Sequence, residues 1–160
     1  RLAASAQPGQ FLIVRTDENG ERVPLTVCDY DKERGSVTIV TQKVGASSKK
    51  ICALEQGESF QDVSGPLGRP SEFVGLSDEE IKQKRFIFIA GGLGTAPVYP
   101  QAKYLYSRGA KVDIIVGAKS ADMLILEEEM SKVCDHLYIC TDDRSCYGKT
   151  CTAMRSWTEI

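Results

Sequence analysis

The chain has 160 residues, of which 42% are hydrophobic and 26% charged, and its formal net charge is −2. This composition is typical of a folded globular protein and excludes a largely disordered chain. There is no basic run, no segment of roughly 18 apolar residues and no signal-peptide pattern in residues 1–10, so we expect a cytoplasmic protein without nucleic-acid partners or membrane insertion.

The first half of the chain carries short runs that are typical of β-strands. These runs are FLIVRT at 11–16, VPLTVCDY at 23–30 and SVTIVTQ at 36–42. Turn signals separate them, Asn19-Gly20 after the first run and Arg34-Gly35 before the third. This alternation predicts an antiparallel sheet or small β-barrel.

A short helix is expected to interrupt this sheet. Ser47 or Ser48 is a suitable N-cap, Ile51 and Leu54 would point inward, and the helix should end before Gly57.

Residues 65–84 are rich in turn-forming residues and then in charges, with no long apolar run. This change in composition predicts a domain boundary, with one domain over 1–75 and a second over 84–160.

The second half alternates strands with helices. Apolar runs at 85–90, 112–118 and 137–140 are typical of parallel strands that are buried on both faces. Helical spacing links Val98, Ala102 and Leu105, with Pro97 suited to the first turn and Gly109 to the position after the last; a second set follows the same spacing, namely Met123, Leu126, Met130 and Val133. The pattern predicts a doubly wound, Rossmann-like α/β domain.

A glycine-rich turn, AGGLGTAP at 90–97, joins the first of these strands to its helix. Glycine at 91, 92 and 94 would let an anionic pyrophosphate approach the backbone at the positive end of the helix dipole. The turn thus predicts dinucleotide binding, although tight packing of strand on helix is an alternative reason for the glycines. No acidic residue closes the second strand, where Gly117-Ala118-Lys119 stands instead.

A second candidate site lies in the first half. Arg22 could pair with a phosphate, and the hydroxyl of Thr26 would lie further along the same ligand. The small-residue turn at Gly45, Ser47 and Ser48 would suit a second phosphate group. Alternatively, Arg22 is a solvated surface charge, and the serines only cap the helix.

Six cysteines stand at 28, 52, 134, 140, 146 and 151. They lack the closely spaced pairs of a structural zinc site, so we expect buried or idle thiols and no metal ligand in this chain.

Six motifs in order resemble the ferredoxin-NADP reductase superfamily: PGQF at 8–11, RVPLTVCDYD at 22–31, SGPLG at 64–68, AGGLGTAP at 90–97, VGAKSADMLILEEEM at 116–130 and YICTDD at 138–143. Within it they are most similar to the small FAD-carrying subunit family of NADH-dependent ferredoxin:NADP oxidoreductase, also called sulfide dehydrogenase. The electron-transfer subunit of dihydroorotate dehydrogenase is the next most similar.

The resemblance implies an FAD-binding β-barrel, incomplete at its N-terminus, followed by a domain for NAD(P)H, with hydride passing between nicotinamide and flavin. Carried over by motif, the FAD contacts would be Arg22, Pro24, Leu25, Thr26, Gly45, Ser47 and Ser48, with the Thr26 hydroxyl near the reacting flavin nitrogen. The pyridine-nucleotide contacts would be Gly91, Gly92, Gly94, Thr95, Pro97, Gly117, Lys119 and Asp142.

The family continues past the point that corresponds to residue 160, to a two-iron two-sulfur site. We therefore expect the cluster beyond this chain and do not assign Cys146 or Cys151 to it. Arg144 stands where the family has a glycine, so the family's turn geometry is not assured at this position.

The resemblance favours an electron-transfer flavoprotein subunit that exchanges hydride with NAD(P)H and serves a larger catalytic partner, or ferredoxin, through the cluster. Alternatives are a dihydroorotate dehydrogenase electron-transfer subunit, a stand-alone flavin reductase and a nucleotide-binding module without redox chemistry. Lys119 and Ser120 could meet a 2′-phosphate, so the choice between NAD and NADP stays open.

Overall fold

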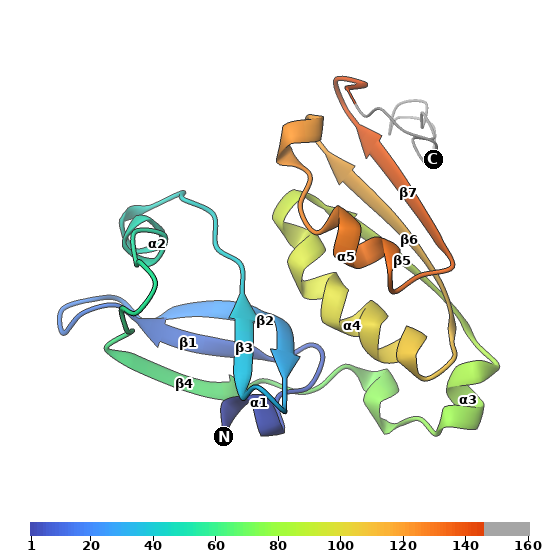
Figure 1. The fold of residues 1–160 in the computed structure, drawn as a ribbon, viewed down its shortest axis with the longest axis horizontal. Helices are drawn as coiled ribbons and strands as arrows, with labels where there is room; N and C mark the ends of the chain where they lie inside the picture. The colour runs from blue at the N-terminus through green and yellow to red at the C-terminus, as the bar shows by residue number, and fades with distance from the viewer. Residues whose placement is uncertain (146–160) are drawn as a thin grey trace. The chain divides into compact units, whose positions relative to one another are not determined.

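The structure is a computed structural model that describes residues 1–145 (Figure 1). The chain divides into two compact units, Arg1–Gly75 and Leu76–Ile160. Unit 1 contains an antiparallel sheet and unit 2 a parallel sheet, which confirms the order of fold classes expected from the sequence.

Unit 1 is built on a four-stranded sheet in the order β3-β2-β1-β4, in which every neighbouring pair is antiparallel. Its elements are α1 (Leu2–Ser5), β1 (Phe11–Arg15), β2 (Val23–Asp31), β3 (Ser36–Ile39), α2 (Ala46–Ile51), β4 (Asp62–Leu67) and the 3-10 turn η1 (Glu72–Gly75). Alternate residues of the strands point into a core of Leu12, Val14 and Val27, to which α2 contributes Ile51.

The sequence patterns did not predict one strand of unit 1. Strand β4 falls partly in the stretch assigned to the boundary, because its sequence, DVSGPL, contains a glycine and a proline and has no apolar alternation. Within the described residues the sheet stays open and no closed barrel forms.

Helix α2 begins two residues earlier than expected, with Gly45 as its N-cap. The side chain of Ser48 supplies the capping interaction from inside the helix, since its Oγ accepts the backbone N–H of Gly45 at 2.9 Å and of Val44 at 3.0 Å. Leu54 lies after the end of the helix.

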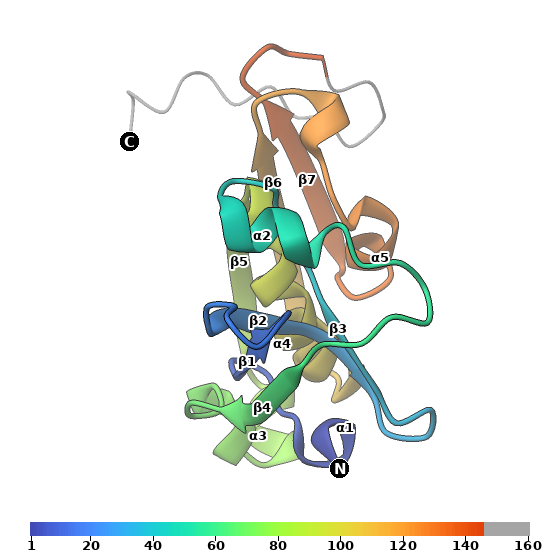
Figure 2. The ribbon, with the colours of Figure 1, turned by 90° about the vertical axis from the view of Figure 1, so that its left-hand side faces the viewer.

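Unit 2 is built on a parallel sheet in the order β5-β6-β7, and its strands run in the same direction (Figures 1 and 2). Its described elements are α3 (Asp78–Lys82), β5 (Arg85–Gly91), η2 (Gly92–Gly94), α4 (Thr95–Ser107), β6 (Lys111–Ala118), η3 (Ala121–Met123), α5 (Glu127–Ser131) and β7 (His136–Thr141). Ala102 and Leu105 of α4 are fully buried, and Gly109 takes the left-handed conformation after the helix, as the sequence pattern predicts.

Only one face of this sheet is covered by helices among the described residues. Helix α4 packs on β5 and β6, α5 packs on β7, and the two helices contact each other. On the opposite face Ile87 and Ile89 are 63% and 62% exposed, so the expectation that β5 is buried on both faces was wrong. An apolar run gives no information on which face is covered.

The second helix of unit 2 is shorter than its spacing predicts. Met123 lies in η3 and is exposed, and Leu126 has a left-handed backbone with φ 58°, which separates η3 from α5. Met130 and Val133 are buried as expected. The apolar spacing over 123–133 therefore predicts correctly that the last positions are buried. It predicts wrongly that a single helix covers the whole stretch.

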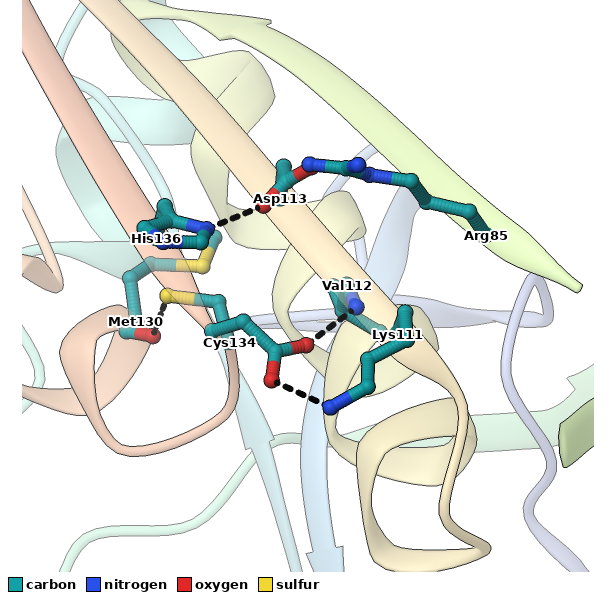
Figure 3. A network of polar contacts seen from close by, with 8 residues as sticks. Arg85, Lys111, Val112, Asp113, Met130, Cys134 and His136 are labelled. Carbon is teal, nitrogen blue, oxygen red and sulfur yellow. Dashed lines mark hydrogen bonds and ion pairs between the residues drawn. The ribbon is translucent and has the colours of Figure 1, made fainter.

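A polar network crosses the sheet of unit 2 near the amino ends of the strands (Figure 3). Asp113 of β6, with a side chain only 9% exposed, accepts hydrogen bonds from Arg85 Nε at 2.7 Å and pairs with His136 Nδ1 at 2.8 Å. The network accounts structurally for the only histidine of the chain. The hydrogen bond from His136 and then the Arg85 guanidinium hold the pKa of the Asp113 carboxyl below its usual value.

We expect the substitution Asp113→Asn to make the free energy of unfolding depend less steeply on pH in the acidic range. A carboxyl whose pKa is lower in the folded chain stabilises it above the ordinary value of 3.8 and loses that effect as the pH falls. Urea unfolding measured from about pH 5 to about pH 2 should show a smaller loss of free energy for the variant than for the wild type. Asp122→Asn, at an exposed aspartate, is the control; equal slopes for Asp113→Asn and wild type would contradict the assignment.

Candidate nucleotide-binding sites

The glycine-rich turn of unit 2 is a single 3-10 turn between strand and helix. β5 ends at Gly91, η2 covers Gly92–Gly94, and α4 begins at Thr95 with Pro97 in its first turn. Because β5, β6 and β7 are parallel, this turn lies at the carboxyl edge of the sheet, where α/β sheets bind ligands.

Packing within the described residues does not require glycine at this turn. A Cβ added at Gly92 or Gly94 would meet no atom within 4 Å, and one at Gly91 would meet only the carbonyl oxygen of Gly117, at 4.0 Å. Gly65 of unit 1 differs, because its Cβ would lie 2.4 Å from Leu12. The alternative that these glycines serve strand-to-helix packing is therefore disfavoured, and open space is left in front of the backbone.

Among residues 1–145, no side chain neutralises the N-terminus of α4. It has no side-chain cap and no acidic residue in its first turn. Helix α3 shows the contrast: Ser77 and Glu80 form a capping box there, and the first turn carries Asp78, Glu79 and Glu80. A 13-residue helix with a bare positive end provides a place for an anion.

Thr95, at the first position of α4, is fully buried, and its Oγ1 has no hydrogen-bond partner within residues 1–145. A buried hydroxyl without a partner costs about 1–3 kcal/mol. The hydroxyl is therefore an unsatisfied polar group beside the turn.

The other predicted nucleotide contacts lie at the same edge of the sheet. Gly117 is the second-last residue of β6. Lys119 directly follows β6, and Asp142 directly follows β7. The backbone N–H of Asp142 donates to the carbonyl of Ala118 at 3.1 Å, so the ends of β6 and β7 are held together. Arg144 has φ 59°, in the left-handed region that favours glycine.

In unit 1, the predicted FAD contacts around β2 lie on different faces of the strand. Leu25 packs against the core together with Val23, whereas Pro24 and Thr26 lie on the other face. Leu25 would therefore meet a ligand through its backbone. The Thr26 hydroxyl makes no hydrogen bond within the described residues, and the Arg22 guanidinium pairs with Asp62 at 2.8 Å.

The turn into α2 lies beside the segment that leads to Arg22. Ser47 Oγ donates to the carboxylate of Glu21 at 2.5 Å, and Lys50 Nζ donates to Asp17 at 2.8 Å. The structure thus brings two stretches 25 residues apart in sequence, Arg22 and Ser47, to one region, as a shared ligand requires. No sequence pattern indicated that Glu21 would contact Ser47, because this contact depends on the tertiary fold.

Gly45 has neither a conformational nor a packing reason to be glycine. Its φ of −137° and ψ of −176° suit any residue, and a Cβ there would meet no atom within 4 Å. As at the turn of unit 2, open space lies in front of a backbone that precedes a helix.

Four of the six thiols lie in the described residues. Within residues 1–145 no group of three His, Cys, Asp or Glu side chains is placed to hold a metal ion, and Cys28, Cys52, Cys134 and Cys140 form no disulfide. Burial raises the pKa of Cys134 to about 11, so it stays protonated. Cys146 and Cys151 lie outside the described residues. None of the helices described has the length and apolar character needed to cross a bilayer.

The chain is similar in sequence and in structure to several known proteins. The chain is 52% identical over 145 residues to an uncharacterized protein in the adh 3′ region of Clostridium beijerinckii, covering 91% of this chain and 49% of that protein. It is 36% identical over 144 residues to a dihydroorotate dehydrogenase B (NAD(+)) electron transfer subunit homolog of Thermotoga maritima, covering 90% and 48%. A solved NADH-dependent reduced ferredoxin-NADP oxidoreductase superposes with a TM-score of 0.78 at 34% identity, covering 90% and 50%.

The chain is related to the ferredoxin-NADP reductase superfamily. No protein-family model matches it. The chain spans about half the length of the curated relatives it matches. The likeness extends across both units, since about nine tenths of the chain is covered in each case.

We expect Gly92→Ala and Gly94→Ala to change stability in opposite directions. Gly92 has φ 51°, where an alanine costs about 1 kcal/mol, whereas Gly94 has φ −62°, where an alanine contributes roughly 0.4–1 kcal/mol by restricting the unfolded chain. Urea unfolding of both variants without added nucleotide measures the difference. Equal free energies of unfolding for the two variants would contradict the conformation described for the turn.

Proposed function

We propose that unit 1 binds FAD, that unit 2 binds NAD(P)H, and that the protein is an electron-transfer subunit in which hydride passes between the two cofactors. The observation that carries this proposal is the glycine turn before α4, where open space and an uncapped helix terminus provide for a pyrophosphate without any packing reason for glycine. The relationship to electron-transfer subunits supports the same assignment.

The residues of unit 2 would bind and orient the dinucleotide. The backbone at Gly91, Gly92 and Gly94 would receive the pyrophosphate, Thr95 would supply a buried hydroxyl, and Pro97 would fix the first turn of α4 without adding an N–H group. Gly117, Lys119 and Asp142 would contact the rest of the nucleotide along the carboxyl edge.

The residues of unit 1 would hold FAD. Arg22, with its guanidinium half-exposed beside Asp62, would bind a flavin phosphate, and Gly45 with Ser47 and Ser48 would form the second phosphate contact once Glu21 releases the Ser47 hydroxyl. Pro24, Leu25 and Thr26 would line the ring system, which accepts and returns hydride when bound. We assign Thr26 to the reacting edge, because its hydroxyl has no partner within the described residues.

In a longer protein that contained this chain, electrons would pass from FAD to a two-iron two-sulfur cluster and then to a larger catalytic subunit or to ferredoxin. The names of several relatives favour a second candidate, the electron-transfer subunit of a dihydroorotate dehydrogenase. Both candidates use the same flavin and nucleotide sites and differ in the partner. A cytoplasmic location stays a prediction.

The proposal is tested by adding FAD to the purified protein, desalting it, recording the visible spectrum and titrating anaerobically with NADH. Retained flavin bands that bleach on adding NADH are the expected result. Binding of NADH without retained flavin would replace the proposal with a nucleotide-binding module, and continuous turnover of NADH with added free flavin as the only electron acceptor would favour a stand-alone flavin reductase.

We expect Gly45→Asp to weaken FAD retention by about 10-fold or more while leaving the fold intact. Aspartate is a favourable N-cap in the extended conformation of Gly45, but its carboxylate would repel a phosphate at the same place. Gly75→Ala is the matched control, because its Cβ also meets no atom within 4 Å. Equal FAD affinities for Gly45→Asp and the control would remove the turn before α2 from the site.

We expect Thr95→Val to raise the stability of the nucleotide-free protein and to lower its affinity for NADH. Valine has the same shape without the buried unpartnered hydroxyl, so the nucleotide-free variant should be more stable by about 1–3 kcal/mol. The affinity for NADH, measured by fluorescence titration, should fall. A variant that binds NADH as tightly as the wild type would show that the Thr95 hydroxyl does not contact the nucleotide.

A further inference from the structure

The loop between β1 and β2, residues 16–22, is attached to helix α2 by a side chain near each of its ends. Asp17 accepts a hydrogen bond from Lys50 Nζ at 2.8 Å. Glu21 accepts one from Ser47 Oγ at 2.5 Å. Both contacts lie inside unit 1. Only the second engages a residue assigned to the cofactor, because Ser47 is one of the proposed phosphate contacts and Lys50 is not.

The Ser47 hydroxyl can donate to only one anion at a time. A serine hydroxyl carries a single donor proton, whereas an ionised carboxylate and a phosphate oxygen are both acceptors. The proton that Ser47 donates to Glu21 is therefore not available to a phosphate, and the two negative charges would repel each other beside the same hydroxyl. A phosphate that binds the Ser47 hydroxyl has to displace Glu21.

The ion pair of the neighbouring arginine does not block a ligand in the same way. Arg22 pairs with Asp62 of β4 at 2.8 Å, and the arginine side chain is 56% exposed. A guanidinium has five N–H donors, so a single carboxylate leaves others for a phosphate. Asp62 can hold Arg22 in place while a ligand binds, and Glu21 is the acid that competes directly.

The carboxylate of Glu21 can leave Ser47 without breaking another contact. Glu21 is exposed, and within residues 1–145 the Ser47 hydroxyl is the only hydrogen-bond or ion-pair partner of its carboxylate. At the other end of the loop, Asp17 also accepts the backbone N–H of Asn19 at 3.2 Å. The loop therefore stays attached to α2 through Asp17 when Glu21 is displaced.

We propose that Glu21 is an autoinhibitory acid of the flavin site: its carboxylate competes with a phosphate of FAD for the Ser47 hydroxyl, so the loop between β1 and β2 limits how tightly unit 1 retains the cofactor. This inference rests on the proposed function, because it needs FAD at Arg22 and Ser47. Removal of the Glu21 carboxylate should tighten FAD binding, whereas removal of a group that contacts the cofactor would weaken it.

The test compares the dissociation constant of FAD, measured by fluorescence titration of the purified protein, between the wild type and variants of the loop. We expect Glu21→Ala to bind FAD about 10-fold more tightly, because the variant lacks the charged competitor for the hydroxyl. Glu21→Gln keeps an acceptor without the charge, so its affinity should lie between those of the wild type and Glu21→Ala.

Glu18→Ala is the matched control for the loss of one negative charge from the loop. Glu18 is exposed, and within the described part of the chain its carboxylate has no hydrogen-bond or ion-pair partner. Because exposed charges are screened by salt, the affinity of this variant for FAD should stay within about 2-fold of the wild type.

A double-mutant cycle separates direct competition from general repulsion. In a protein that already carries Ser47→Ala, the contested hydroxyl is absent, so adding Glu21→Ala should change the affinity for FAD by less than about 3-fold. An effect of Glu21→Ala that is equally large with and without the hydroxyl would overturn the competition at Ser47.

The outcomes distinguish this inference from the proposed function. If Glu21→Ala binds FAD no more tightly than the wild type, or if Glu18→Ala tightens binding equally, the inhibitory role of Glu21 is overturned and the flavin site stands. Retention of FAD by Glu21→Ala but not by the wild type would support the inhibitory role. If neither binds FAD although urea unfolding shows both to be folded, the flavin part of the proposed function fails and this inference fails with it.

Discussion

The parallel alignment of β5, β6 and β7 is the constraint on which the nucleotide site of unit 2 depends. Parallel strands bring their carboxyl ends to one edge, so the turn after β5, the segment after β6 and the turn after β7 become neighbours although they are separated by more than twenty residues along the chain. Helix α4 adds its positive terminus at this edge. The polar network of Arg85, Asp113 and His136 occupies the amino ends of the same strands. The polar network and the candidate nucleotide-binding residues therefore lie at opposite ends of the sheet.

Both candidate sites use the same physical arrangement. At Gly45 and at Gly94 a glycine with an ordinary backbone conformation precedes a helix and has open space in front of its Cα. Such positions admit a phosphate close to the backbone, and selection for folding alone would accept an alanine there. The two sites differ in their side chains, because Ser47 and Ser48 already have partners within unit 1, whereas the Thr95 hydroxyl has none in the described chain. A ligand at α2 would thus have to displace an existing partner, whereas the Thr95 hydroxyl has no partner to displace within the described residues.

Several features were predictable because they depend on short stretches of chain. The strands β1, β2 and β3 follow apolar alternation, α4 follows helical spacing between its proline and Gly109, and the glycine turn lies where a strand changes to a helix. Strand β4 was missed because Gly65 and Pro66 hide its pattern, and the break before α5 was missed because a leucine at 126 does not signal a left-handed backbone. Local patterns report the average preference of a residue, and tertiary packing overrides it at such positions.

The sequence by itself determined an antiparallel unit followed by a parallel α/β unit, the place of the glycine turn and the residues that could meet phosphates, since all of these follow from periodicity and from the stereochemistry of glycine. The tertiary structure alone decided which face of β5 is covered and which partners Arg22 and Ser47 take. Those properties depend on contacts between segments far apart in sequence. The sequence determines which functional group each residue carries, but the tertiary contacts determine whether that group is free to bind a ligand.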